Sequence, residues 1–408
     1  MLLRDIVNIL LLSTIYPLPT NDNKGTAVCH FFTREWVKNG YTVRTVHVQA
    51  VYPLFLYWIA KFHARRIAAK TGAVVYTERL EAIEHYVMDN VPVMRIPVFK
   101  PIPHGKFSLH SIKNAIASIV ADCLENDFKP DVIIGHFPNP QIEMLSLLKR
   151  EFPLAKTCIV MHGDVGITQK VYGKRLSSLM RDIDMWGFRS KSVLREFESV
   201  IGDVDKKFIC HSGIPEAYIK TVNERSFPHA LQNFVYVGLM IDRKYPEKVL
   251  EALEIAYPTK NFHLNYIGDG QRIKDISIEI DKMGLHHQVS LLGRIPREKI
   301  LEEYDKADCM VMISEGEAYG LVYLEAMARG CITVASRNEG FDGVIVDGEN
   351  GFLCEAGNAQ ELASIIKRIN TLTPEKRQLV SENAINTAKR LTDENAARLY
   401  IENVKARM

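Results

Sequence analysis

The sequence lacks most of the features that would assign it to a specialised class of protein. Its net charge is only +2, from 51 Lys and Arg against 49 Asp and Glu. It therefore lacks the overall positive field that nucleic-acid-binding proteins use. It has seven cysteines and no Cys-x-x-Cys pair, which favours reduced, buried thiols over disulfides. We expect a cytoplasmic protein with no nucleic-acid partner.

Long apolar runs are absent as well. The first run, residues 6–12, is short and has no small-residue cleavage site, so we interpret it as a first strand rather than a signal peptide. No segment approaches the roughly 20 apolar residues of a membrane-spanning helix. What recurs is the alternation of strands and helices that is typical of doubly wound α/β folds. With 408 residues, 47% of them hydrophobic, the chain is long enough for two domains.

One stretch, residues 312–336, combines acidic residues with the pattern of a strand, a glycine-rich loop, a helix and a second strand. Glu317 lies in the loop and Glu325 in the first turns of the helix. We therefore expect both carboxylates to face a ligand above the helix N-terminus. Alternatively, Glu317 could be a solvated loop residue and Glu325 an exposed helical residue, with no ligand at either. Gly316 and Gly320, with an apolar helix face beside the acids, favour a built site.

The start of that helix is suited to an anion. Gly320 would allow a ligand to approach the backbone closely. The backbone N–H groups of the first turn, including Leu321 and Val322, have no partner within a helix, and the helix dipole also favours negative charge there. We expect a phosphate group at this position.

The string EAYGLVYLE resembles the signature of two glutamates separated by seven residues in retaining, nucleotide-sugar-dependent glycosyltransferases, known as glycosyltransferase family 4 or glycosyl transferases group 1. The resemblance implies that Glu317 binds donor-sugar hydroxyls and that Glu325 binds the donor ribose. It also implies the α/β fold called GT-B, in which two Rossmann-like, doubly wound parallel-sheet domains face a central cleft. Residues 1–208 would form the acceptor-side domain and 209–392 the nucleotide-sugar domain. The last helix, 393–408, would cross back onto the first domain.

In the first half, candidate residues follow strand ends, where open α/β sheets bind ligands. Gly25 lies in the long loop after the first strand, where the family places glycine beside the donor phosphates, although a plain turn glycine would look the same. His136 and His162 each follow a strand. His136 is as consistent with a structural role. The string MHGDVG resembles the family's His-Gly segment, which implies that His162 faces the donor sugar near the reaction centre.

In the second half, Gly238 ends a strand and Arg243 and Lys244 precede a helix. The family pattern is Gly-Arg, a short spacer, then Lys-Gly. Lys244 coincides with the lysine, but Leu239 replaces the arginine. A diphosphate leaving group needs more than one cation, so we hypothesise that Arg243 substitutes for the missing arginine. By the same resemblance, the segment around Arg294 meets the nucleotide base.

The implied reaction transfers a sugar, with retention of configuration, from a nucleotide-diphosphate sugar such as a UDP- or GDP-sugar. The cations and the helix N-terminus would stabilise the leaving diphosphate, so no metal or cofactor is expected. Two Asp-x-Asp strings, at 182–184 and 203–205, resemble a metal motif of another glycosyltransferase fold but are expected by chance. Two alternatives stay open: a nucleotide-sugar epimerase of GT-B fold, and a catalytically silent partner subunit, which Leu239 favours.

Residues 53–70 join an aromatic, apolar half to a basic half. As a helix, they stack Phe55, Ile59 and Phe62 on one face with Trp58 beside them. This face is consistent with core packing and equally with an interfacial segment on an anionic membrane. The resemblance to bacterial enzymes that build capsule, exopolysaccharide or lipopolysaccharide supports the second interpretation. It predicts a peripheral enzyme on the inner face of the cytoplasmic membrane with a glycan or lipid-linked oligosaccharide acceptor.

Overall fold

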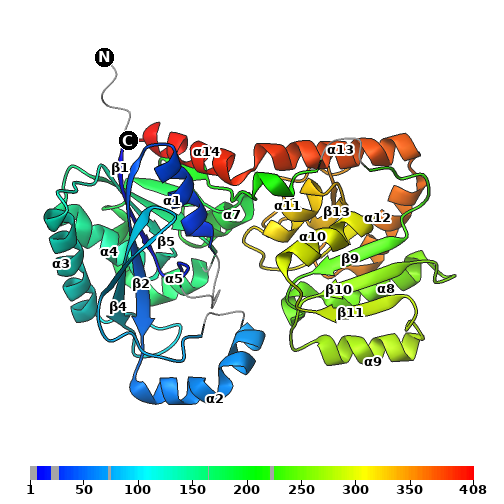
Figure 1. Ribbon diagram of the computed structural model, residues 1–408, viewed down its shortest axis with the longest axis horizontal. Helices are drawn as coiled ribbons and strands as arrows, with labels where there is room; N and C mark the ends of the chain where they lie inside the picture. Colours follow the sequence, from blue (N-terminus) through cyan, green and yellow to red (C-terminus); the bar gives the residue numbers. More distant parts are fainter. Residues whose placement is uncertain (1–6, 20–26, 72–74, 164, 221–224) are drawn as a thin grey trace.

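The computed structural model describes residues 7–19, 27–71, 75–163, 165–220 and 225–408, and only the backbone of residues 65, 66 and 68–71. The chain forms two α/β units side by side, each built on one sheet (Figure 1). Within these residues, no helix is both long and apolar enough to cross a bilayer.

The first sheet has eight strands in the order β3-β4-β2-β1-β5-β6-β7-β8. All neighbouring pairs are parallel except β3 and β4, which form an antiparallel edge hairpin that the sequence analysis did not identify. Its turn places Asp89 and Asn90 at φ 48° and 63°, backbone angles that these two residue types tolerate. The strands are β1 (Asn8–Ser13), β2 (Thr42–Val51), β3 (Glu84–Met88), β4 (Val91–Phe99), β5 (Val132–His136), β6 (Lys156–Met161), β7 (Met185–Phe188) and β8 (Lys207–Ile209).

Helices cover both faces of this sheet, because its central strands are apolar on both sides and leave a buried cluster on each face. Two of the helices begin with serine side chains that accept a first-turn N–H: Ser108 for α3 and Ser190 for α7. The helices of this half are α1 (Val28–Lys38), α2 (Leu54–Thr71), α3 (Leu109–Glu125), α4 (Pro138–Glu151), α5 (Val165–Tyr172), α6 (Leu176–Met180) and α7 (Lys191–Val200).

The second sheet has six strands, all parallel, in the order β11-β10-β9-β12-β13-β14. One large apolar cluster includes side chains from its strands and from the helices around it. The strands are β9 (Asn233–Val237), β10 (His263–Ile267), β11 (Val289–Gly293), β12 (Cys309–Val311), β13 (Ile332–Ser336) and β14 (Phe352–Cys354). The helices are α8 (Pro246–Ala256), α9 (Ile273–Met283), α10 (Arg297–Lys306), α11 (Leu321–Ala328), α12 (Ala359–Thr371), α13 (Pro374–Arg390) and α14 (Asp393–Lys405).

The last helix packs against the first domain. Figure 1 shows α13 over the second domain and α14 continuing over the first. The indole of Trp36 in α1 donates to the Ala397 carbonyl of α14 at 2.8 Å, and Tyr400 of α14 is 1% exposed. Each fully buried side chain of this size contributes about 1.5–3 kcal/mol. The core of the first domain therefore includes the C-terminal residues of the chain.

The two chain crossings between the domains run backbone against backbone. Ile214 donates to the Leu391 carbonyl at 3.1 Å and accepts from the Asp393 N–H at 2.8 Å. A Cβ on Gly213 would lie only 2.3 Å from the Thr392 carbonyl carbon, so no larger residue fits there. The linker and the returning segment are therefore paired along their backbones where the chain passes between the domains.

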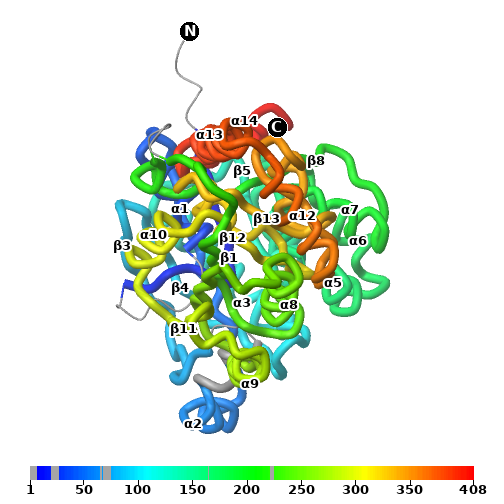
Figure 2. Tube along the Cα trace, turned by 90° about the vertical axis from the view of Figure 1, so that its right-hand side faces the viewer, coloured from blue at the N-terminus to red at the C-terminus, as the bar shows by residue number. Residues whose placement is uncertain are grey.

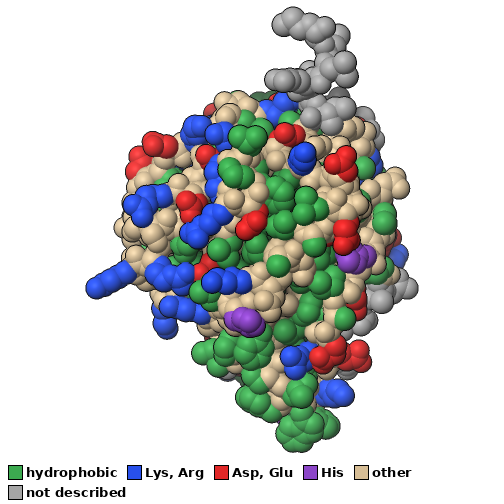
Figure 3. Space-filling model, turned by 90° about the vertical axis from the view of Figure 1, so that its left-hand side faces the viewer, with side chains coloured by type: hydrophobic (Ala, Val, Ile, Leu, Met, Phe, Trp, Pro, Cys, Tyr) green, Lys and Arg blue, Asp and Glu red, His purple; other side chains and the backbone are tan. Residues whose placement is uncertain are grey.

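Helix α2 projects from the first domain at the end opposite α13 and α14 (Figures 1 and 2). Its outer side chains are exposed, namely Phe55 at 62%, Trp58 at 67% and Phe62 at 70%, while Tyr57 and Ala60 face the domain. Figure 3 shows hydrophobic side chains gathered on this tip. Core packing of that face, one of the two interpretations of the sequence, is therefore wrong.

Candidate active site

A cavity of about 540 Å³ lies between the two domains. Its walls come from loops that follow parallel strands and from the helices α5 and α7 behind them, the usual place for ligands in α/β folds. The first domain contributes His162, Gly163, Gly166, Ile167, Ser192, Val193 and Glu196, and the second domain contributes Gly316, Glu317, Ala318, Asn338 and Glu339. The cavity therefore brings together His162 and Glu317, which come from opposite halves of the sequence.

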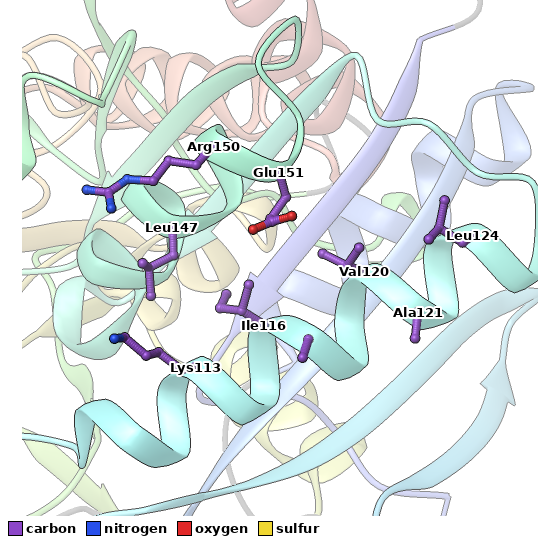
Figure 4. Close-up of a pocket in the computed structure, with 9 residues that line it drawn as sticks. Lys113, Ile116, Val120, Ala121, Leu124, Leu147, Arg150 and Glu151 are labelled. Carbon is purple, nitrogen blue, oxygen red and sulfur yellow. The ribbon is translucent and has the colours of Figure 1, made fainter.

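A hollow of similar size, 550 Å³, lies between α3 and α4 of the first domain (Figure 4). Ile116 and Val120 of α3 face Leu147 of α4 there, and the charged groups are Lys113, Arg150 and Glu151. None of the sequence-predicted site residues lines it. We therefore place the candidate active site in the cavity between the domains.

The loop of residues 315–320 is held by contacts from neighbouring loops. The guanidinium of Arg243 donates to the carbonyls of Glu315 and Gly316, at 3.1 and 3.3 Å. The carboxylate of Glu339 accepts the N–H of Glu317 at 2.8 Å. Burial is the largest influence on Glu339 and raises the pKa of its carboxyl. The sequence analysis did not identify Glu339, although it stands beside Gly340 in a loop that the resemblance covers.

Glu317 is paired with Lys244. The lysine Nζ lies 3.0 Å from Glu317 Oε2, and the two side chains are only 12% and 15% exposed. A Cβ on Gly238 would lie 3.2 Å from the Met312 sulfur and 3.5 Å from that Nζ, so Gly238 lies directly beside the lysine. The structure thus brings Gly238, Arg243 and Lys244 together around the loop of Glu317, which itself lines the cavity.

Gly320 is the N-cap of α11 and has φ 87°, a left-handed conformation. A Cβ there would lie 2.5 Å from the Tyr323 ring, so a larger residue would be strained and would clash. The next residues, Leu321 and Val322, form the first turn of α11, and Leu321 packs against the core of the first domain. The helix N-terminus therefore lies at the junction of the two domains.

Glu325 does not share the environment of Glu317. It is 4% exposed, and its carboxylate accepts a hydrogen bond from Arg297 of α10. Burial raises the pKa of this carboxyl, and the adjacent guanidinium opposes that shift. The sequence analysis did not identify Arg297. Its position three residues after Arg294, in the segment expected at the nucleotide base, was the available signal.

Arg294 itself is 63% exposed in its side chain, and its Nε lies 3.6 Å from Asp269 Oδ2. It is therefore free of deep packing and lies on the same domain as Glu325. Gly25, the remaining predicted site residue, lies outside the described residues.

His162 forms the opposite wall of the cavity. Its Nε2 lies 2.9 Å from Nδ1 of His136, and its ring stacks on Phe137 at a centroid distance of 4.0 Å. Burial lowers the pKa of His136 to about 3 and lowers that of His162 well below its usual value. Both rings are therefore neutral at physiological pH.

Arg189 is a buried cation at the domain junction that the sequence analysis did not identify. It is 3% exposed and donates to the Cys210 carbonyl at 2.6 Å and to the Ser212 hydroxyl. Its guanidinium lies 5.3 Å from the ring centroid of Tyr319, whose hydroxyl donates to the Ser212 carbonyl at 2.9 Å. Tyr319 belongs to the 315–320 loop, so this loop is tied directly to the linker.

The two Asp-x-Asp strings are occupied by structural contacts. Asp184 accepts from Lys149 at 3.0 Å and from the Thr157 N–H at 2.9 Å, and Asp203 pairs with Lys207 at 2.5 Å. Among the described residues, no group of three or more His, Cys, Asp or Glu side chains has the arrangement of a metal site.

With this geometry in place, comparison with known proteins identifies the second half of the chain. Residues 200–387 match the family model described as Glycosyl transferases group 1. This part of the chain is a glycosyl transferases group 1 domain. It contains Lys244, Glu317 and Glu325, so the resemblance noted from the EAYGLVYLE string is confirmed at the level of the domain.

Among curated proteins, this chain resembles an uncharacterized glycosyltransferase of Methanocaldococcus jannaschii. The two are 31% identical over 156 residues, which is 38% of this chain and 44% of that protein. The chain spans less than half the length of the curated relatives it matches.

Solved structures match almost the whole chain. A glycosyltransferase from Rickettsia africae aligns with a TM-score of 0.69 at 16% identity, covering 99% of both chains. Anabaena Alr3699/HepE in complex with UDP and glucose aligns with a TM-score of 0.65 at 17% identity, covering 98% of this chain and 100% of that one. At this identity the likeness shows the fold alone, and it confirms the predicted GT-B fold of two α/β domains.

Proposed function

We propose that this protein is a retaining glycosyltransferase that moves a sugar from a nucleotide-diphosphate sugar, such as a UDP- or GDP-sugar, to a lipid-linked glycan. The observation that carries this proposal is the cavity between the domains, which has Glu317 with its partner Lys244 on one side and His162 on the other. An acid and a cation suit a sugar and its diphosphate, and they lie within the glycosyl transferases group 1 domain.

Glu317 and Lys244 neutralise each other before a donor binds. A bound donor would exchange this pair for two new ones: sugar hydroxyls would donate to Glu317, and the diphosphate would accept from Lys244. Cleavage of the sugar–phosphate bond adds negative charge to the diphosphate, so the lysine would stabilise the transition state more than the ground state. The N-terminus of α11, beginning at Gly320, would add the N–H groups of Leu321 and Val322 to the same anion.

Arg243 would support this step by holding the 315–320 loop through the Glu315 and Gly316 carbonyls, and would place a second cation near Lys244. Glu325 and Arg297 would form the nucleotide side of the site, with the carboxylate accepting ribose hydroxyls and Arg294 near the base. We propose that the chemistry requires no metal, because protein cations and backbone N–H groups would carry the leaving-group charge.

For the acceptor, we propose a lipid-linked oligosaccharide of cell-surface polysaccharide synthesis, reached at the inner face of the cytoplasmic membrane. Helix α2 supports this, because Phe55, Trp58 and Phe62 are exposed, and so are Lys61 and His63 of the same helix. Hydrophobic side chains gather on the projecting tip (Figure 3). Aromatic rings at headgroup depth with adjacent cations are typical of an interfacial helix. The side chains of Arg65, Arg66 and Lys70, which the sequence assigned to the same surface, lie outside the described part of the chain.

A donor screen tests the proposal. Nucleotide-diphosphate sugars are added one at a time, and the midpoint of thermal unfolding is measured, because a ligand that binds the folded state raises it. The stabilising donor is then incubated with the protein and with lipid-linked acceptors, and the anomeric configuration of the product is determined by NMR. A product with retained configuration supports the proposal. Interconversion of the donor sugar without an acceptor would indicate an epimerase, and binding without turnover a silent partner subunit.

A further inference from the structure

Tyr400 of α14 begins a chain of hydrogen bonds that ends at the cavity. Its hydroxyl lies 3.2 Å from His136 Nε2, and His136 Nδ1 lies 2.9 Å from His162 Nε2. The three residues come from the last helix, the end of β5 and the loop after β6. Tyr400 is 1% exposed and His136 is fully buried, whereas His162 lines the cavity.

Every group in this chain is neutral. Burial lowers the pKa of both histidines and raises the pKa of the Tyr400 phenol well above its usual value. Each imidazole therefore carries one N–H, and the phenol keeps its hydrogen. Three hydrogens are thus available, and two of them occupy the two hydrogen bonds.

The hydrogens can be arranged in two directions. In one, Tyr400 donates to His136 Nε2, His136 Nδ1–H donates to His162 Nε2, and His162 keeps its hydrogen on Nδ1. In the other, His162 Nε2–H donates to His136, which donates from Nε2–H to the Tyr400 oxygen. The phenol hydrogen then needs a separate acceptor. Within the part of the chain that the structure describes, His136 is the only hydrogen-bond partner found for the Tyr400 hydroxyl. A buried donor without an acceptor is unfavourable, so the first direction is preferred.

We propose that Tyr400 is a positioning residue that acts through His136 to fix His162 in the tautomer protonated at Nδ1. This inference rests on the proposed function and deepens it, because it assigns the chemical role of His162. In this tautomer the ring nitrogen that is not bonded to His136 is a hydrogen-bond donor. His162 therefore donates to an oxygen of the donor sugar and does not act as a general base, whereas Glu317 across the cavity accepts from sugar hydroxyls.

The tautomer is measured directly on the whole protein. Histidines labelled with ¹⁵N in the ring give different nitrogen shifts and proton couplings for the Nδ1–H and Nε2–H tautomers, and comparison with His162→Gln assigns the His162 signals. We expect the Nδ1–H pattern for His162 in the unchanged protein. The Nε2–H pattern would overturn the inference. This measurement needs no substrate, so its result is independent of whether the proposed glycosyltransferase activity is found.

Tyr400→Phe then tests the role of the phenol, because it removes the hydroxyl and keeps the ring packed against Phe32 and Trp36. We expect the His162 signals to shift to a mixture of tautomers and kcat/KM for the donor to fall about five- to tenfold. Tyr257→Phe is the matched control, since it removes a partly buried hydroxyl hydrogen-bonded to Leu231 and Asn370 in the other domain. We expect it to leave both readouts unchanged. Unchanged His162 signals in Tyr400→Phe would overturn the inference even if activity fell, because the phenol would then be merely structural.

Discussion

The two walls of the cavity differ in the ionisable side chains that they present. The second domain places charged groups there on loops that are fixed by glycines and by one another, as in the pair of Lys244 with Glu317 and the Glu339 carboxylate that holds the same loop. The first domain presents the neutral imidazole of His162, backed by the buried His136, and an acidic side chain, Glu196.

This difference corresponds to the two ends of the proposed donor. A leaving diphosphate gains negative charge during the reaction, so cations beside it lower the barrier. The sugar is uncharged in the ground state and develops positive character in the transition state. An imidazolium facing it would therefore be unfavourable. We infer that the cations lie at the diphosphate end of the donor and the neutral imidazole at the sugar end. The following predictions test that division.

The largest effect is expected at Glu317. Glu317→Gln removes the charge that accepts sugar hydroxyls, and we expect kcat/KM to fall by about 100-fold or more, in line with the loss of a charge-assisted hydrogen bond in the transition state. Affinity for the free nucleotide diphosphate, measured by calorimetry, should not decrease, because the diphosphate contacts Lys244, which loses a competing carboxylate. Glu325→Gln is the counterpart and should weaken the diphosphate and the full donor equally. Equal effects of both variants on both ligands would contradict the assignment of the two acids.

Next in size is the effect at the cations. Lys244→Ala should lower kcat by about 10- to 100-fold rather than only raise KM, because the charge on the diphosphate grows toward the transition state. Arg243→Ala should lower kcat about tenfold if Arg243 substitutes for the family arginine, whose position Leu239 occupies. Lys248→Ala removes a cation of α8 that pairs with Glu251 and should be neutral. A normal kcat in Arg243→Ala would show that the second cation lies elsewhere.

A smaller effect is expected on membrane binding, outside the cavity. The triple change of Phe55, Trp58 and Phe62 to Ser should reduce flotation with anionic vesicles about tenfold, because these rings would lose their apolar contact with lipid. Thermal stability should change little, since exposed side chains contribute less than about 0.5 kcal/mol. Leu154→Ser, at a position 95% exposed on another surface, is the control. Vesicle binding that survives the triple change would show that α2 is not the membrane contact.

The smallest effect concerns acid stability and distinguishes the two domains. The first domain buries His47 and His136, whose pKa values burial lowers to about 3, whereas the described histidines 229, 263, 286 and 287 of the second domain are exposed. His211, in the segment that links the domains, is the exception, because burial lowers its pKa to about 4. Below pH 6.5 these histidines bind protons in the unfolded chain but stay unprotonated in the folded domain. Stability therefore falls as pH decreases, by about 1.4 kcal/mol per pH unit for each such group.

Hydrogen exchange followed by mass spectrometry at pH 7 and pH 5, corrected for the intrinsic exchange rate, measures this difference. We expect protection to decrease in β1, β2 and β5 before it decreases in β9 and β12. Glu325 has the opposite effect on the pH dependence of stability. Because burial raises the pKa of its carboxyl, the folded state takes up this proton more readily than the unfolded chain, and acid does not destabilise the fold through this group. An earlier loss of protection in the second domain would contradict the prediction.

The sequence by itself determined the fold class and the 316–320 part of the second domain's wall of the cavity. The apolar strand, the glycine loop and the following helix are contiguous in the chain, so Glu317, Gly320 and the start of α11 could be placed from local pattern alone. Lys244 could be added because it follows a strand end in the same sheet. The roles of these residues and the domain boundary at 208 stay predictions.

The tertiary structure decided the contacts that join distant segments. It separated Glu325 from Glu317 by pairing it with Arg297, and it exposed the apolar face of α2, whose periodicity is the same for a core helix and an interfacial one. It also brought Tyr400 to His136 across 264 residues of sequence. Such pairings depend on which helix covers which face of a sheet, and this is set by the packing of the whole domain rather than by the local order of side chains.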